Sequence, residues 1–392
     1  MPSVIKIKKG REKRIKGGHL WVFSNEIDGS PKRYEAGGIV DVYSHGNEFL
    51  GRGYINPKSL ISIRILTREK DEINAEFFHK RILKALSYRQ NIYPGANSYR
   101  VVFGESDSLP GLIVDKYENY LSVQMLSLGM DMRRDAILDA LEDIFHPDGI
   151  VERSDTAVRK LEGLNEGKAV SRGSLEGNII MQDDGFKFEV DILSGQKTGF
   201  FFDQKENRKA IGKYIKKGSS VLDCFCYSGA WAIHAAGSGA GEIIGLDSSD
   251  DAIRLAERNA EINGFSKACR FKKTDVFDEL RRLVSSGERY DVIILDPPAF
   301  AKSAGSIREA LRGYNEINLQ AMKLLRDGGT LFTCSCSYHI DRESFRDMLV
   351  RSASDAGRNF RLMEFRGQAF DHPVLLSMKE TEYLKCVVLQ RI

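Results

Sequence analysis

Two carboxylates, Asp223 and Asp247, stand at the ends of consecutive apolar segments, 24 residues apart. The stretch between them, C-F-C-Y-S-G-A-W-A-I-H-A-A-G-S-G-A-G-E-I-I-G-L, indicates a turn, an Ala-rich helix and a second strand. A carboxylate at the carboxyl end of that second strand is well placed to accept hydrogen bonds from ribose hydroxyls. The pattern favours a nucleoside-containing ligand over the alternative of an ordinary sheet with solvent-facing aspartates.

The turn of this unit lacks the glycines that hold a pyrophosphate. The dinucleotide fingerprint G-x-G-x-x-G needs three glycines, and only Gly229 lies in the turn. Bulky residues occupy other positions, including Phe225 and Tyr227. S-adenosylmethionine is a nucleoside without phosphates that carries chemistry, so we expect it to bind at this turn.

A second candidate site follows the apolar segment Tyr290–Leu295, where the chain continues D-P-P-A-F. Two prolines after a buried strand remove backbone donors and stiffen the chain, which holds Asp296 in one orientation. Such a rigid, polar pocket entrance suits a flat ring, and an aromatic residue nearby can stack on a nucleic-acid base. We therefore expect Asp296 and its three neighbours Pro297, Pro298 and Phe300 to contact a base.

The segment T-C-S-C-S (Thr333–Ser337) ends another predicted strand. If the two strands are adjacent, their ends lie about 5 Å apart and a cysteine shares a pocket with Asp296. A thiolate can add to carbon 6 of a pyrimidine and make carbon 5 nucleophilic, while Asp296 hydrogen-bonds the ring nitrogen. The alternative is that both cysteines are small buried hydrophobes.

A glycine-flanked aromatic loop, Phe200–Phe202, precedes this region. It is either core or a cover for one face of the cofactor, and we predict that Phe200 contacts the cofactor. Gln204 and Arg208 would then reach the substrate.

These residues need a scaffold, and the pattern from Ser220 onward alternates strands and helices regularly. That alternation predicts an α/β domain with a doubly wound, mostly parallel sheet over residues 186–392. Residues 71–185 predict a central α+β domain that opens with an amphipathic helix. Residues 1–70 read as short strands separated by glycine turns, which predicts a small β-barrel.

The amino terminus is basic, and its segment K-G-R-E-K-R-I-K-G-G-H-L-W-V-F-S (Lys9–Ser24) resembles the opening of a PUA domain, an RNA-binding module. In that case five side chains would contact phosphates, although a solvated basic tail is equally compatible: Lys9, Arg11, Lys13, Arg14 and Lys16.

The whole-chain composition sets bounds on these readings. The 392 residues carry a net charge of +3 and 42% hydrophobic residues, with no apolar run near the roughly 18 residues of a membrane span and no signal peptide. We expect a cytoplasmic protein of two or three domains. The two C-x-C pairs are spaced too closely for a usual zinc site, so we expect reduced thiols and no metal.

Taken together, the motifs resemble the RlmI family, the ribosomal RNA large subunit methyltransferases that form 5-methylcytosine in 23S RNA. The resemblance spans the chain: D-x-F-C-Y-S-G, D-P-P-A-F, R-G-Y-N-E-I-N, S-C-S, D-H-P-V, F-F-D-Q-K-E-N-R and E-S-D-S-L-P-G-L.

The resemblance implies S-adenosylmethionine as cofactor, ribosomal RNA as partner and a homodimer. It places the nucleophile at Cys336 and cofactor-pocket positions at four aspartates: Asp223, Asp247, Asp275 and Asp296. Ala299 departs from many RNA cytosine-5 enzymes, which carry a second cysteine there, so another base must complete the reaction. The target nucleotide does not follow from the motifs.

Three alternatives stay open on the sequence alone. The same fold could methylate a base nitrogen, with Cys336 packed as core. It could bind a nicotinamide cofactor, although the glycine fingerprint is missing. A non-catalytic protein could bind RNA through the basic amino-terminal domain alone.

Overall fold

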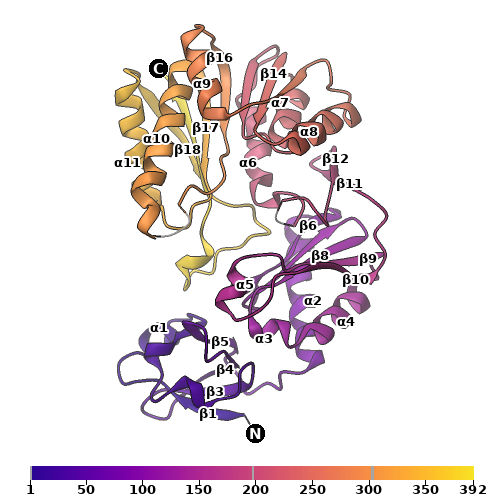
Figure 1. The fold of residues 1–392 in the computed structure, drawn as a ribbon, viewed down its shortest axis with the longest axis vertical. Coiled ribbons are helices and arrows are strands. Elements are labelled where there is room, and N and C mark those ends of the chain that lie inside the picture. Colours follow the sequence, from indigo (N-terminus) through magenta and orange to yellow (C-terminus); the bar gives the residue numbers. More distant parts are fainter. Residues whose placement is uncertain (1, 197, 302–303) are drawn as a thin grey trace. The chain divides into compact units, whose positions relative to one another are not determined.

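A computed structural model describes residues 2–196, 198–301 and 304–392. The chain forms two compact units (Figure 1). Unit 1 comprises Met1–Met181, Val190–Phe202 and Phe370–Thr381, and unit 2 comprises Gln182–Glu189, Asp203–Ala369 and Glu382–Ile392. No helix in the described ranges is both long enough and apolar enough to cross a membrane.

Unit 1 begins with a five-stranded sheet in the order β1-β3-β4-β5-β2. Branched side chains from its strands, among them Ile5, Val42 and Ile63, are fully buried in one cluster. The predicted amino-terminal β structure is therefore confirmed. Its elements are β1 (Ser3–Lys6), α1 (Lys13–Lys16), β2 (Trp21–Phe23), β3 (Ile39–Tyr43), β4 (Phe49–Ile55) and β5 (Ile61–Thr67).

A second five-stranded sheet of unit 1 has the order β10-β9-β8-β7-β6. Helix α2 (Ala75–Ile92) begins at Asn74, whose side chain accepts a 3.1 Å hydrogen bond from the Phe77 N–H, and buries Phe78 and Ile82. The expected apolar stripe is core. The remaining elements are β6 (Ser98–Phe103), β7 (Leu112–Tyr117), β8 (Tyr120–Met125), α3 (Leu128–Asp131), α4 (Arg134–Phe145), β9 (Gly149–Arg153), α5 (Val158–Leu161) and β10 (Lys168–Gly173).

A two-stranded hairpin of β11 (Ile179–Asp183) and β12 (Phe186–Val190) comes next in the chain. Asp184 and Gly185 at its tip both have positive φ, 49° and 86°, as a type I′ turn requires.

Unit 2 holds a seven-stranded sheet in the order β15-β14-β13-β16-β17-β19-β18. Its pairs are parallel from β15 to β17, and β19 runs antiparallel to both of its neighbours. The predicted mostly parallel sheet is confirmed, with strands β13 (Ser220–Cys224), β14 (Glu242–Asp247), β15 (Cys269–Lys273), β16 (Tyr290–Leu295), β17 (Leu325–Ser335), β18 (Phe360–Arg366) and β19 (Lys385–Arg391).

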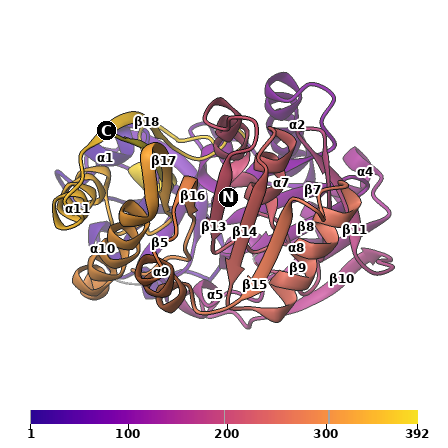
Figure 2. The same ribbon diagram turned by 90° about the horizontal axis from the view of Figure 1, so that it is seen from above.

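Helices cover both faces of this sheet (Figure 2). Leu222 and Ile293 face the cluster that includes residues of α9, α10 and α11, whereas Val221 and Val292 face the cluster that includes residues of α7 and α8. The carboxyl ends of the parallel strands therefore form the edge at which open α/β sheets bind ligands. The helices are α6 (Lys205–Ala210), α7 (Ala230–Gly237), α8 (Asp250–Ile262), α9 (Val276–Ser285), α10 (Ile307–Leu324) and α11 (Arg342–Asp355).

Candidate functional site

The turn after β13 has an unusual backbone. Phe225 and Tyr227 have φ values of 64° and 46°, in the left-handed region, and Gly229 has φ 73°. Each non-glycine residue there costs about 1–2 kcal/mol. Hydrogen bonds hold the turn, from the Cys226 N–H to the Leu246 carbonyl (3.0 Å) and from the Gly229 N–H to the Cys226 carbonyl (2.8 Å). Strain maintained in this way is a frequent property of ligand-binding turns.

Asp247, at the end of β14, is joined directly to this turn. Its Oδ2 accepts a hydrogen bond from the Tyr227 N–H, and its Oδ1 accepts one from the Ser249 N–H, both at 3.0 Å. A carboxylate oxygen can accept more than one hydrogen bond. The fixed carboxylate therefore retains acceptor capacity for the ribose hydroxyls predicted from the sequence.

Asp223 is fully buried. Its Oδ2 accepts a 3.1 Å hydrogen bond from the Ala232 N–H, but its Oδ1 has no hydrogen-bond partner among the described residues. Burial, and secondly the nearby charge of Asp296, raise the pKa of Asp223 well above its usual value. A buried oxygen without a partner is costly. A ligand with a hydrogen-bonding group or a positive charge would satisfy it, so this edge fits S-adenosylmethionine.

Asp296 follows β16 and is held by two side chains. Gln204 Nε2 donates to its Oδ1 at 2.8 Å, and Trp231 Nε1 donates to its Oδ2 at 3.0 Å. The two donors fix the plane of the carboxylate. The sequence predicts Gln204 near this region but does not predict Trp231. The only sequence signal for Trp231 is its place in the first turn of the helix after the nucleoside-binding turn.

The structure brings Cys336 next to the D-P-P segment. Strands β16 and β17 are adjacent, as the proposed shared pocket requires, with Leu295 paired to Thr333. Cys336 lies just beyond β17, is half-buried, and has its Sγ 3.9 Å from the Pro297 carbonyl oxygen. Cys334 is fully buried, and burial raises its pKa well above the ordinary thiol value.

Phe300 is half-buried and packs next to Tyr314 of α10. The two ring centroids lie 4.6 Å apart, and the Tyr314 hydroxyl lies 3.0 Å from the Ser337 Oγ. Tyr314 therefore links the D-P-P-A-F and S-C-S segments. Pro297 is buried and Pro298 is exposed, so the two prolines differ in their access to a base.

Three other predicted site residues make contacts within the protein itself. Phe200 belongs to unit 1, where its N–H donates to the Tyr117 hydroxyl at 3.0 Å. Arg208 is buried, and its Nη2 lies 2.8 Å from the Asp183 carboxylate. Asp275 is exposed and caps α9 by accepting from the Asp278 N–H at 3.1 Å.

The five basic residues of the amino terminus divide into two groups. The Arg14 guanidinium donates to Glu26 at 2.7 Å, and Lys16 pairs with Glu48. The other three are exposed and have no side-chain partner in the part of the chain that the structure describes: Lys9, Arg11 and Lys13. Those three are the ones with charge available for phosphate.

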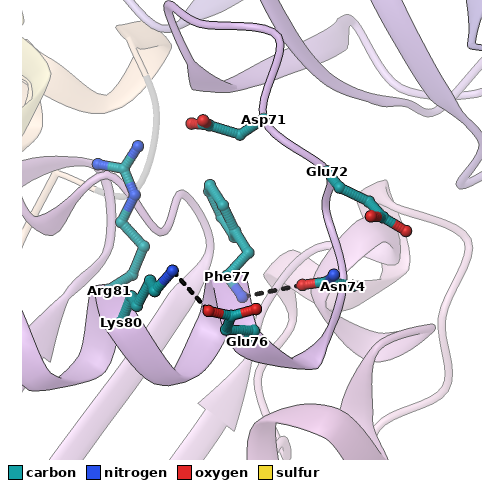
Figure 3. A pocket seen from close by; sticks show the side chains of 7 residues that line it. All are labelled: Asp71, Glu72, Asn74, Glu76, Phe77, Lys80 and Arg81. Atoms are coloured by element: carbon teal, nitrogen blue, oxygen red, sulfur yellow. Dashed lines mark hydrogen bonds and ion pairs between the residues drawn. The ribbon is translucent and has the colours of Figure 1, made fainter.

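A hollow of about 300 Å³ in unit 1 contains none of these residues (Figure 3). Its polar groups largely serve the local fold: Lys80 pairs with Glu76 at 2.6 Å, and Asp71 accepts from the Thr67 hydroxyl at 2.6 Å. It therefore has no link to the predicted chemistry.

Comparisons with known proteins agree with this geometry. Residues 5–68 match the family model of a PUA-like domain, and residues 165–365 match that of S-adenosylmethionine-dependent methyltransferases. "Ribosomal RNA large subunit methyltransferase I" of Vibrio vulnificus is 39% identical over 99% of this chain and 100% of its own length. The Vibrio cholerae protein of the same name is 40% identical over the same shares.

Solved structures show the same fold. A chain described as a SAM-dependent methyltransferase from Streptococcus mutans has a TM-score of 0.85 at 20% identity and covers 99% of this chain and 100% of its own. A methyltransferase complexed with SAH has the same TM-score and identity, and the match covers 100% of both chains. The chain is a methyltransferase that uses S-adenosylmethionine, and it belongs to the ribosomal RNA large subunit methyltransferase I family.

Proposed function

We propose that this enzyme methylates carbon 5 of a cytosine in 23S ribosomal RNA, with Cys336 as the nucleophile. The observation that carries the proposal is the position of Cys336: it is half-buried, while the other five cysteines are buried, and its sulfur lies beside the Pro297 carbonyl. The names of the Vibrio relatives support ribosomal RNA as the substrate.

The chemistry requires a covalent intermediate because carbon 5 of cytosine is a poor nucleophile. The Cys336 thiolate forms a bond to carbon 6, and the electron pair of the double bond moves to carbon 5 and the ring. Bound S-adenosylmethionine would supply an electrophilic methyl group, so that carbon 5 gains the methyl as the sulfonium–methyl bond breaks and S-adenosylhomocysteine leaves. A base then removes the carbon 5 proton, the bond from sulfur to carbon 6 breaks, and the thiolate is restored.

Asp296 has the second role in this proposal. Gln204 and Trp231 fix its carboxylate, so its direction is set before the base arrives. A proton shared between Asp296 and the ring nitrogen would stabilise the charge that develops as sulfur adds. Pro298 and Phe300 would guide the base into the pocket beside Asp296. Asp223 and Asp247 would hold the cofactor.

The amino-terminal sheet would supply the RNA contact. Lys9, Arg11 and Lys13 are exposed on the PUA-like domain and have no side-chain partner among the described residues. Phosphate contacts from such cations position RNA without reading its sequence. A ribosomal RNA substrate, whether free or in an assembling subunit, would be met in the cytoplasm. The family resemblance also supports a homodimer, which light scattering would test.

The experiment is methyl transfer to unmodified 23S RNA with radiolabelled cofactor, followed by digestion and mass spectrometry of the labelled nucleoside. We expect 5-methylcytidine from the native enzyme and from Cys334→Ala. Cys336→Ala should lose at least about a thousandfold in rate while it binds S-adenosylhomocysteine normally. A label on a base nitrogen, or an active Cys336→Ala enzyme, would refute the cytosine-5 mechanism.

A further inference from the structure

Lys385, the first residue of β19, is a buried cation in unit 2 with only 4% of its surface exposed. Its Nζ donates to the Ser337 carbonyl at 2.7 Å and to the Tyr383 carbonyl at 2.8 Å. It forms no ion pair with a carboxylate in the described part of the chain. A buried ammonium without a compensating charge is costly, and such groups concentrate at functional sites.

The position of Lys385 relative to β17 explains which segment it holds. Ser335 and Lys385 are the last paired residues of strands β17 and β19. Cys336 and Ser337 continue beyond this pair and have left the ladder. The hydrogen bond from Nζ to the Ser337 carbonyl therefore fixes the backbone directly after the proposed nucleophile.

Carboxylates near Lys385 already serve other groups. Glu382 forms a 2.6 Å ion pair with Arg342, and Asp341 caps α11 by accepting from the Ser344 N–H at 2.8 Å. Neither is a dedicated counter-ion for Lys385. The remaining nearby group that can carry a negative charge is the thiol of Cys336, which interacts electrostatically with the ammonium.

We propose that Lys385 is a positioning residue for Cys336: its ammonium anchors the S-C-S segment and stabilises the Cys336 thiolate. A cation beside a cysteine increases its thiolate fraction and so its reactivity. Burial lowers the pKa of Lys385 to about 8, and Arg342 acts in the same direction, while Cys336, Glu382 and Asp341 oppose this. The ammonium form is therefore present at neutral pH, where the thiolate is needed.

The test measures Cys336 alkylation by iodoacetamide against pH in the full-length protein, without RNA or cofactor. The other five cysteines are buried, and a Cys336→Ser variant gives the background rate. In Lys385→Met the rate at pH 7 should fall about tenfold, with the midpoint of the profile about one unit higher. Lys385→Arg should restore most of the reactivity, because it keeps the charge and the donors.

Lys385→Gln separates charge from anchoring, since it retains a donor but no charge. We expect it to behave like Lys385→Met, and a native profile in either variant would overturn the proposal. Affinity for S-adenosylhomocysteine and the thermal unfolding midpoint verify that each variant is folded. If Lys385→Met is too unstable for measurement, the comparison of Lys385→Arg with Lys385→Gln decides the matter.

The role of Lys385 rests on the proposed function, so the experiments must be able to refute the role of Lys385 and the role of Cys336 independently. Alkylation reports only on the thiol and does not depend on methyl transfer. An active Cys336→Ala enzyme combined with the expected alkylation profiles would refute the nucleophile and keep the Lys385 contact. Native alkylation profiles in the Lys385 variants, together with an inactive Cys336→Ala enzyme, would refute the role of Lys385 and keep Cys336 as the nucleophile.

Discussion

Two strand ends in unit 2 carry the same C-x-C spacing in different surroundings. At the end of β13, Cys224 and Cys226 are both buried, and burial raises the pKa of each thiol well above its ordinary value. At the end of β17, Cys334 is buried in the same way, but Cys336 is half-buried. Environment, and not spacing, therefore separates a reactive candidate from three inert thiols.

The difference arises from the packing around each thiol, because β13 and β17 are both interior strands of the sheet. Cys226 is held by the hydrogen bond from its N–H to the Leu246 carbonyl. A side chain on Gly245 would come within 3.2 Å of the Cys226 sulfur, so this thiol is tightly enclosed. Both Cys226 and Cys336 lie beyond the paired residues, since pairing stops at Cys224 in β13 and at Ser335 in β17, but Cys336 is only half-buried there.

The largest effect expected from this comparison is covalent trapping. RNA that carries 5-fluorocytidine should form a denaturant-stable adduct with the native enzyme in the presence of S-adenosylmethionine. After addition of sulfur and methyl transfer, carbon 5 holds fluorine in place of the proton that elimination removes, so the bond from sulfur to carbon 6 persists. Gel electrophoresis under denaturing conditions would detect the complex.

Cysteine variants at the two strand ends make this trap specific. Cys336→Ala should form no adduct, whereas Cys226→Ala should form the native amount. If Cys336→Ala still forms the adduct, the nucleophile is another residue. The cysteines at the ends of β13 and β17 would then not differ in reactivity as proposed.

A second prediction concerns the glycine in the turn after β13. Gly229→Ala should cost about 2–4 kcal/mol in unfolding free energy. The left-handed φ accounts for about 1 kcal/mol of this, and the new Cβ, 3.0 Å from the Ala256 Cβ and 3.1 Å from the Phe271 ring, accounts for the rest. Denaturant titration of the purified variant would measure it.

Gly218→Ala is the matched control for that substitution. Gly218 has a similar φ of 85°, but a Cβ there meets nothing within 4 Å. Its cost should be about 1 kcal/mol. Equal losses in the two variants would show that close packing contributes nothing to the turn.

Much of this site can be predicted from the sequence because it lies at strand ends. Regular alternation predicts the sheet, and apolar runs that end in Asp223, Asp247 and Asp296 predict which residues share its edge. The adjacency of β16 and β17 is only an assumption at the level of the sequence, and the pairing of Leu295 with Thr333 confirms it.

Other parts depend on contacts that no local pattern encodes. Trp231 and Lys385 reach their partners from a helix and from a distant antiparallel strand, and neither belongs to a recognisable motif. The sequence predicts Arg208 beside the substrate, but it does not show that Asp183 of the preceding hairpin pairs with it. Partners distant along the chain determine these three roles.

The third prediction uses the buried carboxyl after β13. Its raised pKa means that folded Asp223 holds a proton that the unfolded chain has lost above about pH 4. Since the unfolded state then binds fewer protons, unfolding free energy falls as pH rises from about 4 toward the raised pKa. Asp223→Asn cannot ionise, so it should lose less stability over this window, as denaturant titrations at several pH values would show.

Asp291 supplies a control of opposite sign. Although burial alone would raise its pKa, hydrogen bonds from Ser220 and the charge of Arg326 lower it. Its contribution to stability is therefore present above about pH 4 and is lost as pH falls through the lowered pKa. Asp291→Asn should be less stable than the native protein near neutral pH. Parallel behaviour of the two variants would contradict the assignment of Asp223 as a protonated group.

The smallest effect is expected at Cys334, two residues from the proposed nucleophile. Its sulfur is packed beside Cys386, which is paired with it across β17 and β19. Cys334→Ala should cost about 1 kcal/mol in unfolding free energy, from lost burial and a small cavity. Methyl transfer should stay within about threefold of native, because no role in the proposed chemistry falls to this thiol. A folded Cys334→Ala protein as inactive as Cys336→Ala would mean that burial does not distinguish the two cysteines.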